Sequence, residues 1–345
     1  MITLHVDGAA WRAHQRRVVA ATPGLVPVAK GGGYGFGLAT LAAEAQALGV
    51  GTLAVGTASE VRYVRGAFAG DVVVLQPWRP DDRDAVALLG DERIVHTVSR
   101  VSDLAAVAGS GERPRVLLEV LTSMRRFGIA ADTFADVAPH LASVELAGWT
   151  LHLPMPAATR GNAAEAERLA RAALAVRQAP VWLSHVTSAD YDRLRASLFA
   201  ETRKRVGTEL WLGGAAKRQV TATVLDVHPV GRGERIGYWQ RAMPADGHVV
   251  VVSGGTAHGI ALEAPTAAAT MRQRLVSVAT GSMEAVGLAL SPFTVQGAKR
   301  WFVEPPHMQA SMLFLPGKVL PPHVGDEVPV EVRLTTATVD RIVVE

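Results

Sequence analysis

A lysine at the end of an apolar run is the residue that most directly suggests chemistry. The run LVPV at residues 25–28 is followed by AKGGGYG at residues 29–35, which places Lys30 beside a glycine turn. Lysine becomes a nucleophile, able to form a Schiff base, when desolvation or nearby cations lower its pKa, and the end of a buried strand supplies that desolvation. A phosphate-binding turn and a plain strand-to-helix turn remain alternatives, because a short motif does not separate them.

Eight short β-rich runs before residue 213 alternate with alanine-rich segments. They lie at residues 26–29, 52–56, 72–76, 93–98, 115–121, 148–153, 180–186 and 203–207, and a helix is expected after each except the last. Strands that are apolar throughout, rather than alternating, are typical of parallel sheets buried on both faces. We therefore expect an α/β fold with a (β/α)8 TIM barrel over residues 8–213, and an open doubly wound sheet is the alternative.

The character of the sequence changes near Gly214. Alanine-rich periodicity gives way to β-like runs at residues 219–230, 248–254, 300–305, 311–317, 327–336 and 340–345, separated by Pro and Gly. This pattern predicts a C-terminal all-β domain over residues 214–345. Residues 2–6 lie outside the barrel strands and are expected to form an extra strand that is able to join this domain.

Composition excludes several classes of function. The chain has 345 residues, a formal net charge of +3 and no cysteine, so disulfides, thiolate nucleophiles and Cys-ligated metals are excluded. Basic residues are scattered among acidic ones without interleaved aromatics, so nucleic-acid binding is not expected. No apolar stretch reaches the roughly 18 residues of a membrane helix and no signal peptide is visible, so we expect no membrane association and a cytoplasmic location.

Several candidate residues fall at the ends of the expected barrel strands. Lys30 ends the first strand, Glu119 and Arg126 lie at and beyond the fifth, His152 ends the sixth, Ser188 follows the seventh and Gly207 follows the eighth. Barrel chemistry occurs at the carboxyl ends of strands, and phosphate groups commonly bind after strands seven and eight. A lysine and a phosphate site on one barrel suggest pyridoxal phosphate as cofactor.

The chain resembles the alanine racemase family of barrel-type pyridoxal-phosphate enzymes over nearly its whole length. The segment VPVAKGGGYGFG at residues 26–37 is similar to the family's first-strand signature. This resemblance implies that Lys30 carries pyridoxal 5'-phosphate as a Schiff base and that Tyr34 contacts its phosphate. The segment SMRRFGI at residues 123–129 resembles a second family motif, which implies that Arg126 lies near the phenolic oxygen of the cofactor.

Two further segments extend the resemblance. GWTLHLP at residues 148–154 places His152 where the family carries a histidine, at the end of the sixth strand. SHVTSAD at residues 184–190 looks like the family's phosphate loop, with Ser188 matched and Thr187 in place of an asparagine. The resemblance implies that Ser188 binds the phosphate, although a serine there also fits a helix N-cap, and one serine can do both.

The segment RVGTELWLG at residues 205–213 is similar to a family segment that follows the eighth strand. By this resemblance, the backbone N–H groups of Gly207 and Thr208 bind phosphate, and Arg205 faces the pyridine nitrogen. An arginine stays protonated, so the pyridine nitrogen would stay unprotonated and the ring would be a weaker electron sink. Arg205 therefore favours reversible α-proton removal over decarboxylation, because related decarboxylases carry a carboxylate at this place.

The chain also departs from the family at two functional positions. Glu119 stands where many racemases carry a lysine that becomes carbamylated, and a glutamate can supply the same negative partner to an arginine. The family's second base is a tyrosine in a Gly-Tyr-Ala-Asp-Gly stretch, but the corresponding segment SGGTAHG at residues 253–259 has no tyrosine. His258 is the best substitute because an imidazole has a pKa near 6.5, and a histidine of a surface loop is the alternative reading.

These observations predict an amino-acid racemase or epimerase that depends on pyridoxal phosphate, with Lys30 as one base and His258 as the second. The substrate is expected to be an amino acid that is not necessarily free alanine, because loss of the usual loop chemistry opens the site to a bulkier one. The resemblance also implies a homodimer in which each active site draws loops from the partner's second domain. Two alternatives are a pyridoxal-phosphate-binding protein that has lost catalysis and an enzyme of a different reaction, such as decarboxylation or elimination.

Overall fold

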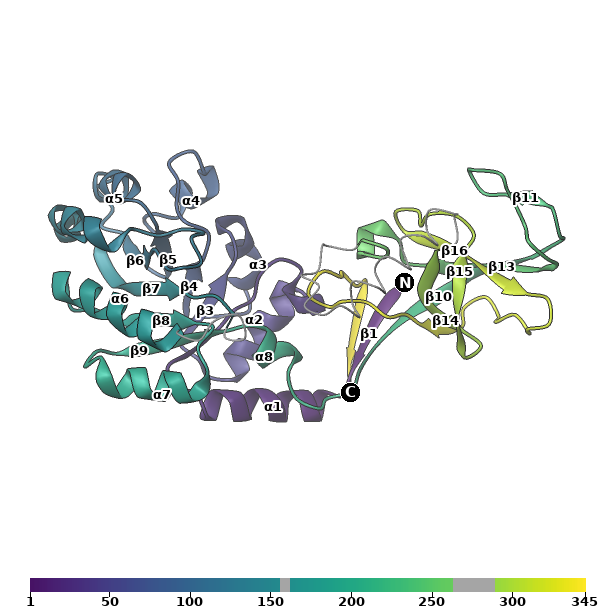
Figure 1. Ribbon diagram of the computed structural model, residues 1–345, viewed down its shortest axis with the longest axis horizontal. Helices are drawn as coiled ribbons and strands as arrows, with labels where there is room; N and C mark the ends of the chain where they lie inside the picture. Colours follow the sequence, from purple (N-terminus) through teal and green to yellow (C-terminus); the bar gives the residue numbers. More distant parts are fainter. Residues whose placement is uncertain (156–161, 263–288) are drawn as a thin grey trace. The chain divides into compact units, whose positions relative to one another are not determined.

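The computed structural model describes residues 1–155, 162–262 and 289–345 (Figure 1). The chain divides into two compact units. The larger unit contains residues 12–33 and 37–214, and the smaller unit contains residues 1–11, 34–36 and 215–345. Each unit is therefore assembled from segments that are separated in the sequence.

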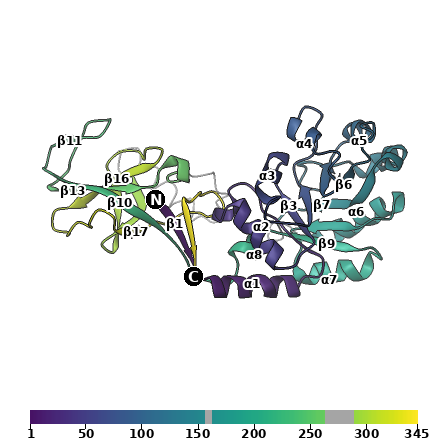
Figure 2. The same cartoon turned by 180° about the vertical axis from the view of Figure 1, so that it is seen from behind.

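An eight-stranded parallel sheet forms the larger unit (Figure 2). Its strands are β2 (Leu25–Pro27), β3 (Thr52–Val55), β4 (Asp71–Val74), β5 (Ile94–Val98), β6 (Arg115–Val120), β7 (Glu145–His152), β8 (Val181–Ser184) and β9 (Thr202–Val206). They pair in the order β2-β9-β8-β7-β6-β5-β4-β3. An isolated parallel bridge between Val28, just after β2, and Ala54 of β3 connects the first and the last of these strands. The predicted parallel barrel is confirmed, and each strand overlaps one of the eight β-rich runs.

Apolar side chains fill the interior of the barrel, and most of its strands are largely apolar, with β9 (TRKRV) as the exception. A buried cluster takes residues from β2 to β6 and from β8: Val26, Val28, Ala54, Val73, Val95, Leu117 and Trp182. The guanidinium of Arg203, on β9, lies 4.8 Å from the centre of the Trp182 ring. The barrel therefore has a packed core, and polar groups are concentrated at its rim.

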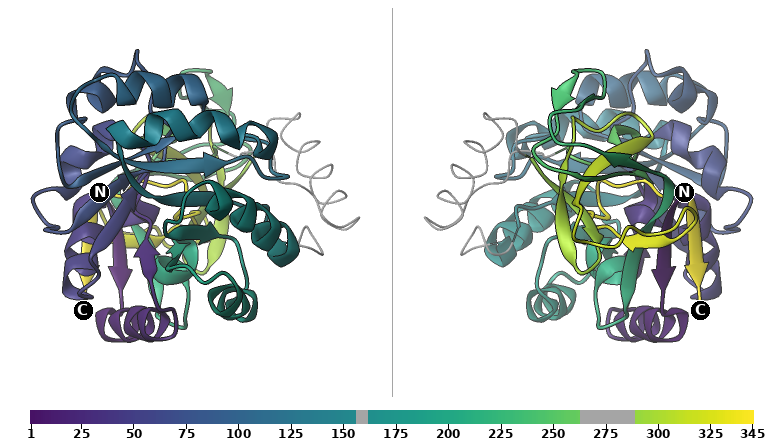
Figure 3. Two further views of the ribbon diagram at one scale, coloured as in Figure 1. Left: turned by 90° about the vertical axis from the view of Figure 1, so that its left-hand side faces the viewer. Right: turned by 90° about the vertical axis from the view of Figure 1, so that its right-hand side faces the viewer.

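Helices cover the outside of the barrel strands (Figure 3). They are α1 (Gly8–Ala20), α2 (Leu38–Ala47), α3 (Val61–Val64), α4 (Arg83–Ala87), α5 (Val101–Ala108), α6 (Asn162–Val176), α7 (Ser188–Ser197) and α8 (Thr208–Leu212). The segment after β6 is a 3-10 helix, η3 (Ala131–Ser143), rather than the expected amphipathic α-helix. Pro139 lies inside η3 and lacks a backbone N–H, which disfavours an α-helix there.

Helix α8 follows the last barrel strand, where the sequence predicts no helix. Its Trp211 is fully buried, and the indole N–H donates to the carbonyl of Val28 over 2.8 Å. The imidazole Nε2 of His14, on α1, lies 2.7 Å from the carbonyl oxygen of Glu209. These contacts hold a five-residue helix that is too short to show a period in the sequence.

The smaller unit is a mostly antiparallel sheet with the order β14-β15-β16-β13-β10-β1-β18, in which β17 also pairs with β10. Its strands are β1 (Ile2–Val6), β10 (Arg218–Val230), β13 (Gly247–Ser253), β14 (Leu290–Val295), β15 (Ala298–Phe302), β16 (Ala310–Pro316), β17 (Glu327–Pro329) and β18 (Arg341–Val344). A short hairpin joins β11 (Arg235–Ile236) and β12 (Arg241–Ala242). The predicted C-terminal β architecture is confirmed.

Strand β1 lies inside this sheet. It pairs antiparallel with β10 and parallel with β18, so the first and the last strands of the chain are neighbours. A strand was expected over residues 327–336, but the observed strand β17 is shorter and ends at Pro329. Among the described residues, the structure has no helix that is both long and apolar enough to cross a membrane.

Candidate active site

Lys30 lies where the first barrel strand gives way to a turn. The N–H of Ala29 donates to the carbonyl of Ala54 over 2.8 Å, which fixes the chain at the rim of the barrel. The N–H of Gly33 then donates to the carbonyl of Lys30 over 3.1 Å, and Gly31 has a φ of 59°. Glycine adopts this left-handed conformation without a Cβ penalty. The turn therefore leaves the Lys30 side chain at the carboxyl end of β2.

The surroundings of Lys30 favour its neutral amine. Part of the side chain is exposed, yet burial is the largest cause that lowers the pKa of Lys30, followed by the charges of Arg126 and Arg205. The carboxylate of Glu60 opposes them and raises this pKa. Because only a neutral amine attacks a carbonyl, the net lowering suits a lysine that binds a carbonyl compound.

Glu60 is a residue of this site that the sequence analysis missed. Its carboxylate accepts the N–H of Gly31 over 2.8 Å, of Gly56 over 2.6 Å and of Thr57 over 3.3 Å. A Cβ on Gly56 would lie 2.9 Å from Glu60 Oε2 and 3.1 Å from the Cβ of Lys30. Glu60 thus ties the turn after Lys30 to the loop after β3. The Thr-x-x-Glu spacing of Thr57 and Glu60 is a capping-box signal that would have indicated it.

Arg205, at the end of β9, is a buried cation. Burial lowers its pKa to about 10, while Glu119 raises this pKa and Arg126 lowers it. The guanidinium therefore stays charged at neutral pH. Its Nη2 donates to the carbonyl of Leu151 over 3.4 Å and to Ser184 Oγ over 3.3 Å, and its buried Nε has no hydrogen-bond partner among the described residues. A buried donor without a partner indicates a place for an acceptor that the protein does not supply.

His152, at the end of β7, is held next to Arg205. Its Nδ1 lies 2.9 Å from Ser184 Oγ, and its backbone carbonyl accepts the hydroxyl of Thr122 over 2.6 Å. Burial is the largest cause that lowers the pKa of His152 to about 2, and the charges of Arg205, Arg126, His185 and Lys30 follow. The imidazole is therefore neutral near pH 7.

Glu119 and Arg126 come from β6 and from the loop after it. Glu119 is buried, and burial raises the pKa of its carboxyl, while Arg205, Arg126 and Arg79 lower it. Its Oε2 has no hydrogen-bond partner within the described parts of the chain. Arg126 is exposed, and its charge also affects the pKa of Lys30 and His152. A buried carboxylate therefore shares the rim with several arginines.

The predicted phosphate contacts lie at the starts of two helices. Ser188 is the exposed first residue of α7. The N-cap of this helix is Thr187 and not Ser188, because the Thr187 hydroxyl accepts the N–H of Asp190 over 3.1 Å. Gly207 is the N-cap of α8, and the exposed Thr208 is its first residue. The first N–H groups of a helix have no intrahelical acceptor, so both helix starts can donate to an anion.

Tyr34 and His258 belong to the smaller unit. Tyr34 has a left-handed φ of 55°. His258 is buried after β13, where its Nδ1 accepts the N–H of Gly255 over 3.4 Å and its Nε2 lies 3.1 Å from Asp340 Oδ1. Because Nδ1 accepts, Nε2 carries the proton that Asp340 accepts. Both ring nitrogens of His258 are therefore engaged.

A second histidine was missed at the barrel rim. His185 follows β8 with a φ of 58°, and its ring centre lies 5.0 Å from that of His152 in an edge-to-face arrangement. Burial lowers the pKa of His185, as do the charges of Arg205, Lys30 and Arg126. The sequence motif contained this residue, but the backbone conformation that directs it to the rim cannot be read from composition or periodicity.

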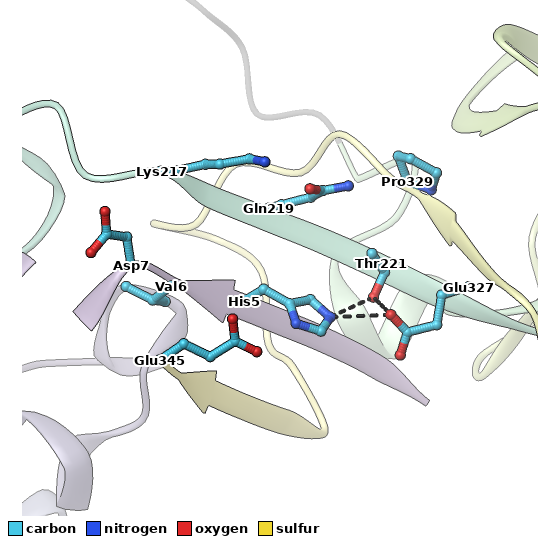
Figure 4. Close-up of a pocket in the computed structure, with 9 residues that line it drawn as sticks. All are labelled: His5, Val6, Asp7, Lys217, Gln219, Thr221, Glu327, Pro329 and Glu345. Carbon is cyan, nitrogen blue, oxygen red and sulfur yellow. Dashed lines mark hydrogen bonds and ion pairs between the residues drawn. The ribbon is translucent and has the colours of Figure 1, made fainter. Parts of the chain in front are cut away.

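The smaller unit has a polar cavity of about 610 Å³ (Figure 4). His5 Nε2 lies 3.1 Å from both Thr221 Oγ1 and Glu327 Oε2, and the Thr221 hydroxyl donates to the same carboxylate over 2.9 Å. The residues that line the cavity include none of the predicted site residues. Among the described residues, no group of three or more His, Cys, Asp or Glu side chains is arranged to hold a metal ion.

Solved structures of alanine racemases share this fold. The enzyme of Bartonella henselae, in a structure described as having covalently bound pyridoxal phosphate, matches with a TM-score of 0.69 and 16% identity, covering 96% of this chain and 90% of that chain. The alanine racemase of E. faecalis matches with a TM-score of 0.66 and 20% identity, over 95% and 88% of the two chains. At these identities the likeness shows the fold.

Sequence comparison gives the family. The alanine racemase of Desulfovibrio desulfuricans is 29% identical over 147 residues, covering 41% of this chain and 39% of that protein. That of Acidiphilium cryptum is 24% identical over 275 residues, covering 75% and 76%. The chain thus spans well under half of the first relative. Residues 6–212 match the family model described as the N-terminal domain of alanine racemase. The chain belongs to this alanine racemase N-terminal domain family.

Proposed function

We propose that this protein is a pyridoxal-phosphate-dependent amino-acid racemase or epimerase in which Lys30 binds the cofactor. One observation carries the proposal: Lys30, with a lowered pKa, shares the rim of a parallel barrel with the buried Arg205, whose Nε lacks a partner among the described residues. Membership of the alanine racemase family and the likeness to structures of alanine racemases support it.

The residues present at the rim fit this cofactor. Lys30 would attach it covalently, and the Arg205 Nε is a buried donor suited to an aromatic ring nitrogen. Arg126 would lie near the phenolic oxygen, and His152 would contact the ring from the end of β7. The N–H groups of Gly207 and Thr208, the hydroxyl of Ser188 and, in the proposal, the hydroxyl of Tyr34 would bind the phosphate. Pyridoxal phosphate supplies an electron sink for the electron pair left when an α-proton leaves.

The chain's own residues would set how strong that sink is. Arg205 remains a cation at neutral pH because its pKa is about 10, so it donates hydrogen bonds and does not give up a proton. A ring nitrogen facing it stays unprotonated. The buried Glu119 would balance the positive charge of Arg205 and Arg126. This arrangement favours reversible proton transfer at the α-carbon, which Lys30 would carry out at Nζ on one face.

Racemisation also needs a proton-transfer group on the opposite face. The proposal from the sequence is His258, which would act in the site of a partner chain. Asp340 beside it lies 3.1 Å from Nε2 and would orient the ring. To accept a proton, however, His258 must first release the N–H of Gly255 from Nδ1. His258→Asn should abolish turnover if His258 is this group, and sedimentation at micromolar concentration should show a dimer.

A decisive experiment traps the cofactor on its lysine. The purified protein is mixed with pyridoxal phosphate, its visible absorbance is recorded, and the adduct is reduced with borohydride and mapped by mass spectrometry. We expect a visible band and modification of Lys30, both absent in Lys30→Arg, while Lys299→Arg on the surface behaves like the wild type. Modification scattered over surface lysines, without a visible band, would contradict the proposal.

The second candidate function is a protein that binds the cofactor without turnover. The absence of tyrosine from residues 253–259 and the engaged nitrogens of His258 favour it. Measuring the α-hydrogen of candidate amino acids in deuterated water separates the two, because a binding protein produces no exchange. Chiral chromatography of the products would reveal decarboxylation or elimination, against which Arg205 argues. The amino-acid substrate and a cytoplasmic location remain part of the proposal.

A further inference from the structure

His185 is the histidine at the barrel rim with the most freedom to transfer a proton. Neither of its ring nitrogens has a hydrogen bond to a described residue, whereas Nδ1 of His152 is bonded to Ser184 and both nitrogens of His258 are engaged. A general base needs a free lone pair within reach of the proton that it removes. Of these three imidazoles, only His185 has both ring nitrogens without a hydrogen bond to a described residue.

The backbone around His185 is fixed in an uncommon conformation. Its φ of 58° lies in the left-handed region, where residues other than glycine are uncommon. The buried Asn162 donates from Nδ2 to the carbonyl of His185 over 2.9 Å and to the carbonyl of Pro154 over 2.8 Å. This amide therefore ties the loop after β8 to the loop after β7. Strained residues held in this way occur at functional sites.

The charged side chains that act on His185 are those of the proposed active site. Arg205, Lys30 and Arg126 all act on the imidazole, and the neutral ring of His152 meets it edge to face. These cations, together with burial as the largest cause, hold the pKa of His185 below its ordinary value of 6.5. The imidazole is therefore neutral near pH 7, the state in which it accepts a proton, and it lies in the same unit as Lys30.

We propose that His185 is the second proton-transfer residue, acting on the same α-carbon as Lys30. This inference rests on the proposed function. In one direction, His185 would take the proton as the α-carbon–hydrogen bond breaks, and the bound cofactor would supply the sink for the electron pair. Lys30, which would receive a proton at Nζ from the ammonium group of the incoming amino acid, would give a proton to the other face, where a new carbon–hydrogen bond forms. One proton is taken up and one released, and the reverse direction exchanges the two roles.

The test uses holoenzyme with L-alanine, and then a panel of free amino acids, in deuterated water. His185→Asn is the main variant because asparagine tolerates a left-handed backbone. We expect the visible cofactor band and one-sided α-hydrogen exchange to remain, while formation of the opposite enantiomer falls about 100-fold or more. His140→Asn, in η3, is the matched control and should keep wild-type rates. Racemisation by His185→Asn within threefold of wild type would overturn the inference.

A second variant separates proton transfer from a structural role. His185→Gly removes the imidazole and suits the left-handed backbone, and added free imidazole should restore racemisation. Failure of rescue in a variant that retains the visible cofactor band would overturn the inference. Loss of racemisation in His258→Asn, with His185→Asn still active, would do the same and favour His258. A wild-type protein with the visible band but no α-hydrogen exchange on any amino acid would instead overturn the proposed function.

Discussion

Replacing Glu60 by glutamine tests whether one carboxylate organises the turn that presents Lys30. Glu60 Oε1 accepts the N–H of Gly31, while Oε2 accepts those of Gly56 and Thr57. Glutamine has the same shape but only one side-chain oxygen and a donating amide. Whichever way the amide is turned, its NH2 group faces a backbone N–H, so at least one of these hydrogen bonds is lost.

The expected loss follows from the types of hydrogen bond. A hydrogen bond to a charged group contributes about 1.5–3 kcal/mol, and those that survive become neutral and about half as strong. Because the loss of one such bond alone costs about 1.5–3 kcal/mol, Glu60→Gln should lower the free energy of unfolding by at least this amount. It also removes the negative charge that raises the pKa of Lys30, so this pKa should fall further below its ordinary value of 10.5.

Two assays measure the two effects. Urea denaturation gives the free energy of unfolding, and an unchanged slope with a lower midpoint would show a change in stability alone. The pH dependence of the reaction of Lys30 with pyridoxal phosphate gives its pKa, because the neutral amine reacts. Glu167→Gln, at an exposed pair with Arg171, is the control and should change stability by no more than about 0.5 kcal/mol. A similarly small change in Glu60→Gln, or a higher pKa of Lys30, would refute the reasoning.

Two further predictions concern the barrel. Trp211→Phe removes the donor to the buried carbonyl of Val28 and should lower the free energy of unfolding by about 1–3 kcal/mol in urea, and an unchanged midpoint would contradict this. The pKa of His152 is about 2 in the folded protein against 6.5 as the ordinary value, so the unfolded chain binds more protons between these limits and stability should fall as the pH drops below 6.5. His152→Gln should make unfolding free energies at pH 7 and pH 5 more alike, and an unchanged difference would count against that pKa.

Most barrel strands could be predicted because a parallel strand buried on both faces is largely apolar, so its position shows directly in the sequence. The exception is β9, which has the sequence TRKRV. The helices could be predicted less well. Pro139 lies inside a helical segment and converts it to a 3-10 helix, and α8 depends on Trp211 reaching the carbonyl of Val28. Tertiary contacts of this kind join residues far apart in the chain and leave no local pattern.

Part of the candidate site could also be proposed from the sequence. Lys30, Glu119 and His152 were proposed because the carboxyl ends of parallel strands meet at one rim, and Arg205 was proposed from the family resemblance. Glu60 was overlooked although the spacing of Thr57 and Glu60 is a capping-box signal, and His185 was overlooked because its placement depends on the sign of one φ angle.

The sequence also could not show which residues contact the candidate site residues in the folded protein. Asp340 lies 82 residues beyond His258, so the contact that engages Nε2 had no sequence signal. The N-cap of α7 was considered for Ser188, but Thr187 occupies it, because the helix begins one residue earlier than an N-cap at Ser188 requires. Such differences of one residue decide which hydroxyl meets a helix N–H and which remains exposed.

The place of β1 between β10 and β18 has a consequence for synthesis on the ribosome. Ile2 pairs with Ala222 and Thr3 with Arg341, so β1 waits for partner strands that follow all segments of the larger unit in the chain. The segments of the larger unit, which end at Gly214, are complete by then and can fold first. Until β10 arrives, β1 is an unpaired strand open to association with other nascent chains. A ribosome that stalls after Gly214 would therefore hold a complete set of barrel segments together with an unpaired, aggregation-prone β1.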